Sequence, residues 1–299
     1  MSYSLKYCGL EGQSGLYARV QRLLDGKWWD QIASAWISSP TSQCNIALTE
    51  GSASLYTATA SLTSAPGGIY GINIYDSGDN LIVLGNDQVP KNDTVLQLIN
   101  TVQRRMRLPQ SPSLAASHAA LLLEFLIQVQ NDMVSENILW PELLVTGSLM
   151  AETGSLWCLL SPPNVSEIDQ IENLQIGTSA PLIRLTDDVF LTTQRQYSGS
   201  TGQPLYYRLA GEVMGYPLLS LLPVPDDDYQ IDFELYRRPE PLASATDKPH
   251  LDKDTLLAGS LFLARKDQGE DYTADLAAFQ AKMSLGSARA LPNLAVRVI

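Results

Sequence analysis

Histidine and cysteine are scarce in this sequence, which limits the metal and nucleophilic chemistry that it can support. Its 299 residues include only two histidines, His118 and His250, and three cysteines. Neither histidine belongs to an HExxH motif or to a pair at metal-ligand spacing. The cysteines are odd in number and widely separated, so they form neither a disulfide framework nor a CxxC zinc motif. We therefore expect reduced thiols and no metal site.

The signatures of the common enzyme classes are also missing. The chain contains no GxSxG elbow of a serine hydrolase, no GxxxxGK[ST] phosphate loop and no GxGxxG dinucleotide motif. The densest carboxylate cluster, Asp226–Asp228, lacks the alternating ligands and the glycine of a calcium loop, and is typical of a solvated turn. We therefore expect a protein without catalytic residues and without a cofactor.

Positive charge is scarce as well. The chain has 20 Lys and Arg against 32 Asp and Glu, a formal net charge of −12. Such a surface repels phosphate, which excludes ordinary electrostatic binding of DNA but not a protein that surrounds DNA without holding it. The one dense basic patch consists of Arg104, Arg105 and Arg107. It either complements the C-terminal end of a predicted helix or forms a docking contact with an acidic partner or with DNA.

No hydrophobic run is long enough to cross a bilayer. The most apolar stretch, residues 119–129, is far shorter than the roughly 20 residues of a membrane span. The first residues also lack the apolar region of a signal peptide. We therefore expect a soluble protein that is made in a cytosol and has no membrane partner.

The first ninety residues have a pattern typical of β-strands. Apolar and polar residues alternate over 17–23, and short apolar runs recur at 45–49, 55–60 and 69–75. Turn sequences such as Asp25-Gly26 separate these runs. This spacing predicts a small all-β, immunoglobulin-like sandwich over residues 1–90, which we expect to fold independently and to lie on the outside of any assembly.

The remainder, residues 91–299, shows a mixed pattern and is predicted to form a second domain. Helices are expected within 94–133 and 252–287, on either side of a β-rich segment at 143–242, so the fold class is α+β with a helical bundle and an antiparallel β-rich part. The helix at 114–133 is apolar over most of its girth, which predicts burial on several sides or a subunit interface. His118 lies on its apolar face and is expected in the core or in an interface.

The tail at 288–299 has strand character and follows Gly286, where we expect the last helix to end. Apolar residues occupy both faces of an extended chain there, an unusual choice for a solvated end. We expect the tail to add a strand to a partner's sheet; a tail folded back on its own domain is the alternative. The candidate interface residues are Leu294, Val296, Arg297, Val298 and Ile299.

The order of these segments resembles that of the head-to-tail adaptor (connector) proteins of tailed bacteriophages. The resemblance covers residues from about 93 to 299. It rests on amphipathic helices that close at Trp140–Leu143, a β-rich middle with segments 181–190, 202–211 and 229–242, and a helix pair at 256–283. Residues 1–90 resemble the small β-sandwich modules found on phage structural proteins, through segments 56–60 and 66–76.

The resemblance implies a structural protein of the virion neck and not an enzyme. Such adaptors form a ring, here expected to be a dodecamer, that binds the portal protein on one side and the tail or nozzle protein on the other. DNA passes through the lumen without sequence-specific binding. Adaptors of this kind grip the portal with C-terminal extensions, which makes the portal the first candidate partner of the tail and a neighbouring subunit the second. Arg104, Arg105 and Arg107 are further candidates for either contact.

Two alternatives belong to other classes. A tail-fibre or receptor-binding protein would be mainly β throughout, so the predicted helices discriminate against it. A glycan hydrolase needs a pair of carboxylates in one cleft, and the sequence places no such pair.

Overall fold

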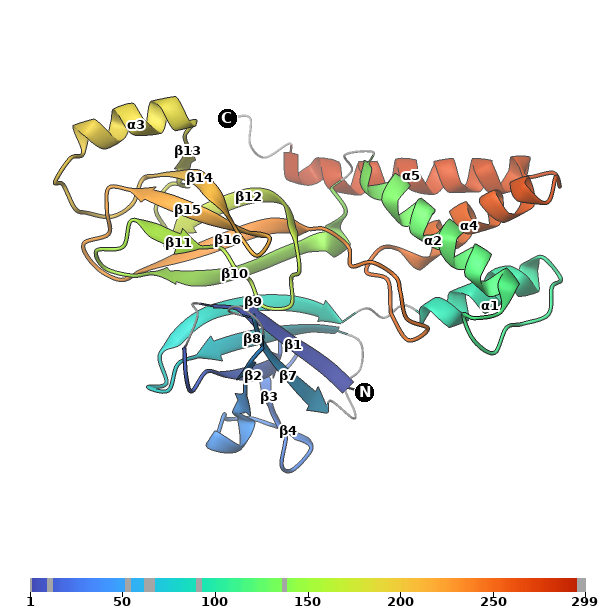
Figure 1. Ribbon diagram of the computed structural model, residues 1–299, viewed down its shortest axis with the longest axis horizontal. Coiled ribbons are helices and arrows are strands. Elements are labelled where there is room, and N and C mark those ends of the chain that lie inside the picture. The colour runs from blue at the N-terminus through green and yellow to red at the C-terminus, as the bar shows by residue number, and fades with distance from the viewer. Residues whose placement is uncertain are drawn as a thin grey trace. The chain divides into compact units, whose positions relative to one another are not determined.

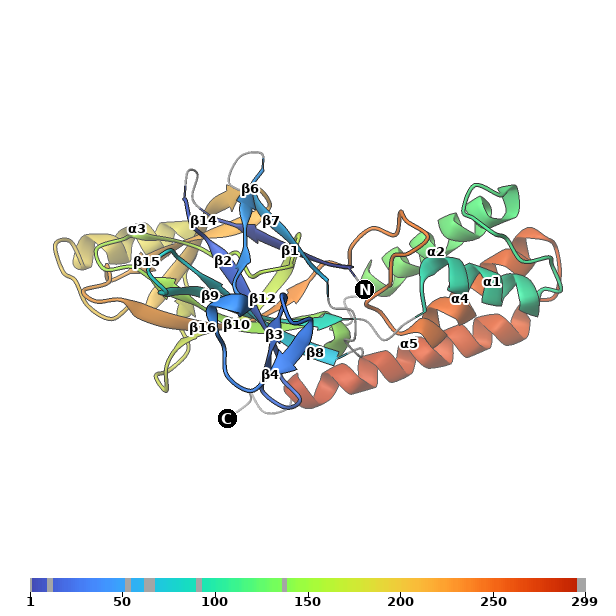
Figure 2. The same ribbon diagram turned by 90° about the horizontal axis from the view of Figure 1, so that it is seen from below.

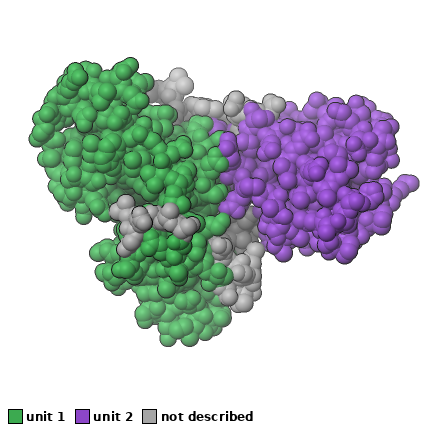
Figure 3. All heavy atoms as spheres, viewed as in Figure 1, with its two compact units in different colours: residues 1–89, 145–237 green, residues 90–144, 238–299 purple. Residues whose placement is uncertain are grey.

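The structure sorts the helical and strand segments of the chain into two units. The computed structural model describes residues 2–9, 13–51, 55–61, 68–89, 93–135 and 139–294 (Figure 1). Unit 1 comprises residues 1–89 and 145–237, and unit 2 comprises residues 90–144 and 238–299 (Figure 3). Unit 1 holds the strands and unit 2 holds helices, so the predicted α+β class is confirmed.

Among its described residues, unit 1 is built from short and medium strands and one α-helix, α3 (Asp187–Gln196). The strands are β1 (Ser2–Cys8), β2 (Tyr17–Arg22), β3 (Lys27–Asp30), β4 (Ala35–Ile37), β5 (Ile46–Ala47), β6 (Thr49–Glu50), β7 (Leu55–Ser61), β8 (Gly68–Tyr75), β9 (Leu81–Val89), β10 (Leu144–Ala151), β11 (Trp157–Leu159), β12 (Ile168–Ile176), β13 (Ile183–Arg184), β14 (Tyr206–Val213), β15 (Tyr216–Leu222) and β16 (Tyr229–Arg237).

These strands form three sheets among the described residues. The largest has the order β12-β16-β10-β9-β8-β2-β3-β4, with β5 paired to β2; the others have the orders β1-β7-β6 and β11-β15-β14-β13. Within the first ninety residues, Leu5 and Tyr56 of the small sheet share one core with Ile72 of the large sheet. Two packed sheets therefore make up the all-β N-terminal region that the alternation pattern predicted.

The structure divides the chain differently from the expected boundary near residue 90. Strand β10 pairs antiparallel with β9, so that Leu149 lies opposite Val83 and Ser148 lies opposite Leu84. Leu149 and Phe233 also belong to the same apolar core as Val83 and Ile72. Because one sheet and one core join residues from both predicted domains, residue 90 marks the place where the chain leaves unit 1 and not the end of that fold.

Unit 2 contains the helices α1 (Val95–Arg105), α2 (Ser117–Ser135), α4 (Lys253–Asp267) and α5 (Thr273–Leu294), with a short 3₁₀ turn, η2 (Pro141–Leu143). Thr94 and Gln97 form a capping box that begins α1, in which the Thr94 N–H donates to the Gln97 Oε1 at 2.8 Å. An apolar stripe of α1, which includes Val95, Leu98 and Val102, is fully buried. The helix that was expected within this part of 94–133 is confirmed.

The central helix of unit 2 is α4, whereas burial on several sides, or else a subunit interface, was predicted for the helix at 114–133. Helix α4 packs against α1, α2 and α5, and it is buried from Thr255 to Leu261 (Figure 2). A β carbon on Gly259 would lie 2.6 Å from a methyl of Val129 and 3.0 Å from the ring of Phe279. The glycine therefore lets α2 and α5 approach α4 closely. Helix α2 buries one face, and His118 lies on its exposed side, so the histidine is not in the core of the described subunit; its place in an interface stays a prediction.

The last helix does not end at Gly286, as predicted, but continues to Leu294. Gly286 is buried because the Trp140 ring lies against it: an added β carbon would be 2.4 Å from that ring. The indole N–H of Trp140 donates to the Met133 carbonyl at 2.9 Å, which holds the ring in place. The glycine is thus a packing residue, and the predicted strand at 288–294 is a helix.

Candidate partner-binding site

The arginine patch (Arg104, Arg105 and Arg107) is positioned by the C-terminal end of α1. Arg107 adopts a left-handed backbone with φ of 58°. Its N–H donates to the Arg104 carbonyl at 3.1 Å, and the Leu108 N–H donates to the Gln103 carbonyl at 2.8 Å. These two bonds form a Schellman motif, which satisfies carbonyls at the helix end through the backbone alone.

A buried hydrogen-bond cluster fixes the loop that follows the patch. The Gln103 amide donates to the Ser111 hydroxyl at 2.8 Å, and the Ser111 N–H donates to the Gln103 Oε1 at 3.0 Å and to the Asn100 Oδ1 at 2.8 Å. Gln103 and Ser111 are buried, so these bonds are shielded from water. The arginines therefore extend from a held scaffold and not from a free loop.

All three side chains of the arginine patch are exposed, and none forms an ion pair with a described residue. Other cations of unit 2 behave differently. Lys253 pairs with Asp93 at 3.7 Å, Arg265 with Asp275 at 2.6 Å, and Lys282 with Asp254 at 3.9 Å. The patch is therefore an uncompensated concentration of positive charge on a unit whose formal charge, from 12 basic and 13 acidic residues, is close to zero.

Negative charge is concentrated in unit 1. Residues 145–237 contain 4 Lys and Arg and 12 Asp and Glu, a formal charge of −8. The three-aspartate turn (Asp226–Asp228) lies between β15 and β16 and is exposed, with no ion pair to a described cation. The sequence interpretation of a solvated turn therefore agrees with its surroundings.

The three-aspartate turn is ordered by hydrogen bonds that use one oxygen of each carboxylate. The N–H and hydroxyl of Thr153 both donate to the Asp228 Oδ1 at 2.8 Å, and they lower the pKa of that carboxyl. The Tyr229 hydroxyl donates to the Asp226 Oδ1 at 2.7 Å, and the Asp228 N–H donates to the Asp227 Oδ1 at 2.8 Å. The Oδ2 atoms accept no hydrogen bond from the described residues, so each carboxylate keeps an oxygen for a partner.

The tail residues that were predicted to bind a partner are not brought to a described site. Leu294 is the last residue of α5. Val296, Arg297, Val298 and Ile299 lie outside the described residues, so their role as an interface strand stays a prediction.

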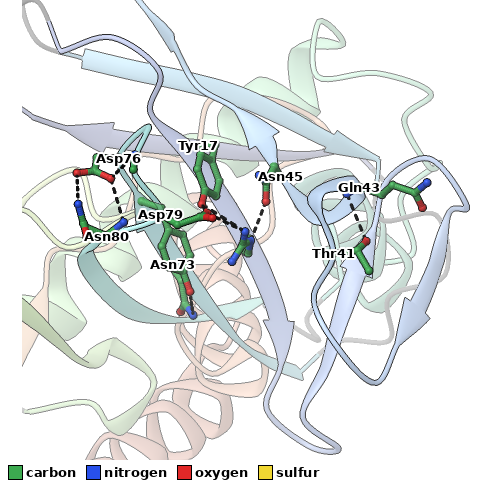
Figure 4. A network of polar contacts seen from close by, with 11 residues as sticks. Tyr17, Thr41, Gln43, Asn45, Asn73, Asp76, Asp79 and Asn80 are labelled. Carbon is green, nitrogen blue, oxygen red and sulfur yellow. Dashed lines mark hydrogen bonds and ion pairs between the residues drawn. The ribbon is translucent and has the colours of Figure 1, made fainter.

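A polar network on the N-terminal strands is formed by hydrogen bonds and an ion pair among its own residues (Figure 4). Arg19 donates to Asn45 at 2.7 Å and to Asp79 at 3.1 Å, and the Tyr17 hydroxyl also donates to Asp79. Asp76 accepts from the backbone N–H groups of Gly78 and Asn80. These bonds tie β2 to the turns around it, which is a structural role.

The cysteines offer no reactive thiolate. Cys8, Cys44 and Cys158 are free and buried. Cys158 borders a cavity of about 230 Å³ in unit 1, and burial raises the pKa of its thiol to about 12. Within the described ranges, no three His, Cys, Asp or Glu side chains gather in a way that could hold a metal ion. No helix in the same ranges is long and apolar enough to span a membrane.

Comparison with known proteins identifies the larger part of the chain. No curated protein matches it. The sequence model of the SU10 adaptor protein family matches residues 93–297. The match begins just before α1 and takes in both the arginine patch and the three-aspartate turn, while strands β1 to β9 lie outside it. Because well over half of the chain is matched, the protein belongs to the SU10 adaptor protein family, a family of phage structural adaptors.

Proposed function

We propose that this protein is a subunit of the head-to-tail adaptor ring of a tailed phage, which joins the portal at the capsid vertex to the tail or nozzle. The observation that carries the proposal is the family match over residues 93–297. That range includes nearly all of unit 2 and the whole acidic segment 145–237 of unit 1.

The charge distribution suits a ring around DNA. A segment with a formal charge of −8 would repel the phosphates of a passing duplex, so that DNA slides through the lumen without binding. The proposed ring is a dodecamer located in the neck of the virion, and the protein acts by binding and not by catalysis.

The C-terminal end of the chain is the proposed contact with the portal. It follows α5, and its residues Val296, Val298 and Ile299 are apolar while Arg297 offers one positive charge. An extended apolar segment binds well when it adds to the edge of a partner's sheet, because the backbone is then fully hydrogen-bonded.

The test uses portal-bearing heads from a phage that lacks this protein. Purified protein is added, and the vertex is imaged by electron microscopy. A ring of protein on the portal supports the proposal. Binding at the fibres or at the tail tip, with none at the portal, would instead favour a receptor-binding protein.

A second variant locates the portal contact. Removing residues 291–299 is expected to abolish binding to heads while the far-ultraviolet circular dichroism spectrum stays close to that of the full chain. Loss of the folded spectrum would show that the tail belongs to the subunit itself.

A further inference from the structure

We propose that neighbouring copies of this protein associate head to tail through charge, with the arginine patch of one copy bound to the three-aspartate turn of the next. The inference rests on the proposed ring and names the contact that would close it. Both surfaces are described, exposed and without ion pairs to described residues.

The arginine patch is not needed to fold its own subunit. The Schellman bonds already satisfy the carbonyls of Gln103 and Arg104. Three positive charges within four residues repel one another, and Arg107 stands at a left-handed position where glycine is usually favoured. The mutual repulsion of the three charges opposes the favourable interaction of Arg104 and Arg105 with the C-terminal end of α1, and an anionic partner would relieve that repulsion.

The carboxylates of the turn match the chemistry of the patch. Guanidinium groups bind carboxylates in planar pairs of hydrogen bonds, and each aspartate of the turn has an Oδ2 that accepts no bond from the described residues. Asp187, an exposed carboxylate on α3, is by contrast already paired with Arg208 at 3.2 Å. The three-aspartate turn, with three consecutive exposed carboxylates and no ion pair to a described cation, is therefore open to a second cation.

Charge complementarity makes a second copy a suitable occupant of the patch. A second copy brings the acidic segment 145–237, whose formal charge of −8 is opposite in sign to that of the patch. The patch belongs to unit 2 and the turn to unit 1, so the contact joins two different surfaces. Contacts of this kind repeat from copy to copy. They form a closed ring when the rotation between neighbouring copies brings the last copy back to the first.

Two neutralised variants test the contact. One carries Arg104→Gln, Arg105→Gln and Arg107→Gln; the other carries Asp226→Asn, Asp227→Asn and Asp228→Asn, which keeps the Oδ1 acceptors of the turn. Self-association is followed by sedimentation velocity over a range of concentrations and salt. Arg195→Gln and Asp188→Asn, which remove exposed charges elsewhere, serve as controls.

Each triple variant alone is expected to associate at least about tenfold more weakly than the wild type, and the controls are expected to associate normally. An equimolar mixture of the two triple variants should form a 1:1 dimer that does not grow, because each variant retains only one working surface. Raised salt should weaken the wild-type contact.

Three results would overturn the inference. The first is normal association of the Arg→Gln variant, which would assign the patch to the portal or to DNA. The second is a mixture that forms no dimer although both variants are impaired. The third is a wild-type protein that does not self-associate either free or on portal-bearing heads. Self-association as described without any binding to heads would leave this contact standing and would reject the proposed function instead.

Discussion

Gly147 of β10 lies directly opposite Gly85 of β9 in the large sheet of unit 1. A β carbon on Gly147 would be 2.1 Å from the Leu84 carbonyl oxygen and 2.6 Å from the Phe233 ring, and one on Gly85 would be 2.6 Å from the Pro163 ring. Both positions therefore require glycine, and the pair allows the strand from the middle of the chain to join the N-terminal strands.

Gly147→Ala is accordingly expected to destabilise unit 1 by about 2 kcal/mol or more, because the backbone carbonyl that it would meet cannot move aside cheaply. Urea unfolding followed by tryptophan fluorescence measures the change. Gly202→Ala is the control: its nearest neighbour, in Pro223, would be at an ordinary 3.6 Å. Equal stability of the two variants would contradict the packing argument.

Residues 1–89 alone are expected to unfold without a sharp transition, contrary to the independent folding that the sequence suggested. In isolation, β9 loses its partner β10, and Val83 loses the core that it shares with Leu149 and Phe233. Thermal circular dichroism of this fragment and of the whole chain tests the expectation. A cooperative melt of the fragment, with dispersed amide signals in NMR spectra, would restore the original domain boundary.

Gly286→Ala separates helix propensity from packing, because the two predict changes of opposite sign in the free energy of unfolding. Propensity alone would stabilise α5 by about 1 kcal/mol. The added β carbon would lie 2.4 Å from the Trp140 ring, and this overlap predicts instead a loss of stability of about 1–3 kcal/mol. Chemical denaturation decides between them, with Ser284→Ala on the exposed side of the same helix as a nearly neutral control. A more stable Gly286→Ala variant would mean that the indole can move away.

Arg107→Gly is expected to raise stability and to weaken self-association at the same time. Glycine adopts the left-handed backbone of this position without the strain of a β carbon, a gain of up to about 1 kcal/mol. Arg107→Gln is the matched comparison, with unchanged stability and the same weakened association. An Arg107→Gly variant that associates normally would remove Arg107 from the contact, and the thermal midpoint would show whether the strain is real.

Local predictions succeeded where a short stretch of sequence determines the outcome. The stripe of Val95, Leu98 and Val102 sets the buried face of α1, and a helix was correctly expected there. The alternation in the first ninety residues likewise predicted strands correctly. The position of the arginine patch at a helix end was also predicted, although its left-handed Arg107 carries no local signal that distinguishes it from an ordinary helical arginine.

Predictions failed where a residue serves a distant partner. Gly286 resembles a helix terminator because glycine often ends helices, yet its role depends on Trp140, far away in the sequence. The apolar girth of α2 predicted burial on several sides or a subunit interface; within the subunit, the tight fit at Gly259 places α4, and not α2, between two other helices. The hydrophobic periodicity of a sequence predicts which surface of a helix is apolar, but it does not predict which neighbouring helix covers that surface.

The sequence by itself determined the α+β class, the caps and buried stripe of α1, the acidic charge and the order of segments that places the chain among phage adaptors. Only the tertiary structure decided which strands share a sheet. Asn86 of β9 donates to the Thr146 hydroxyl of β10 at 2.9 Å, although the two residues are 60 apart in the chain. Such pairing depends on close backbone approach between segments separated by two helices, and hydrophobic periodicity within either strand contains no record of it.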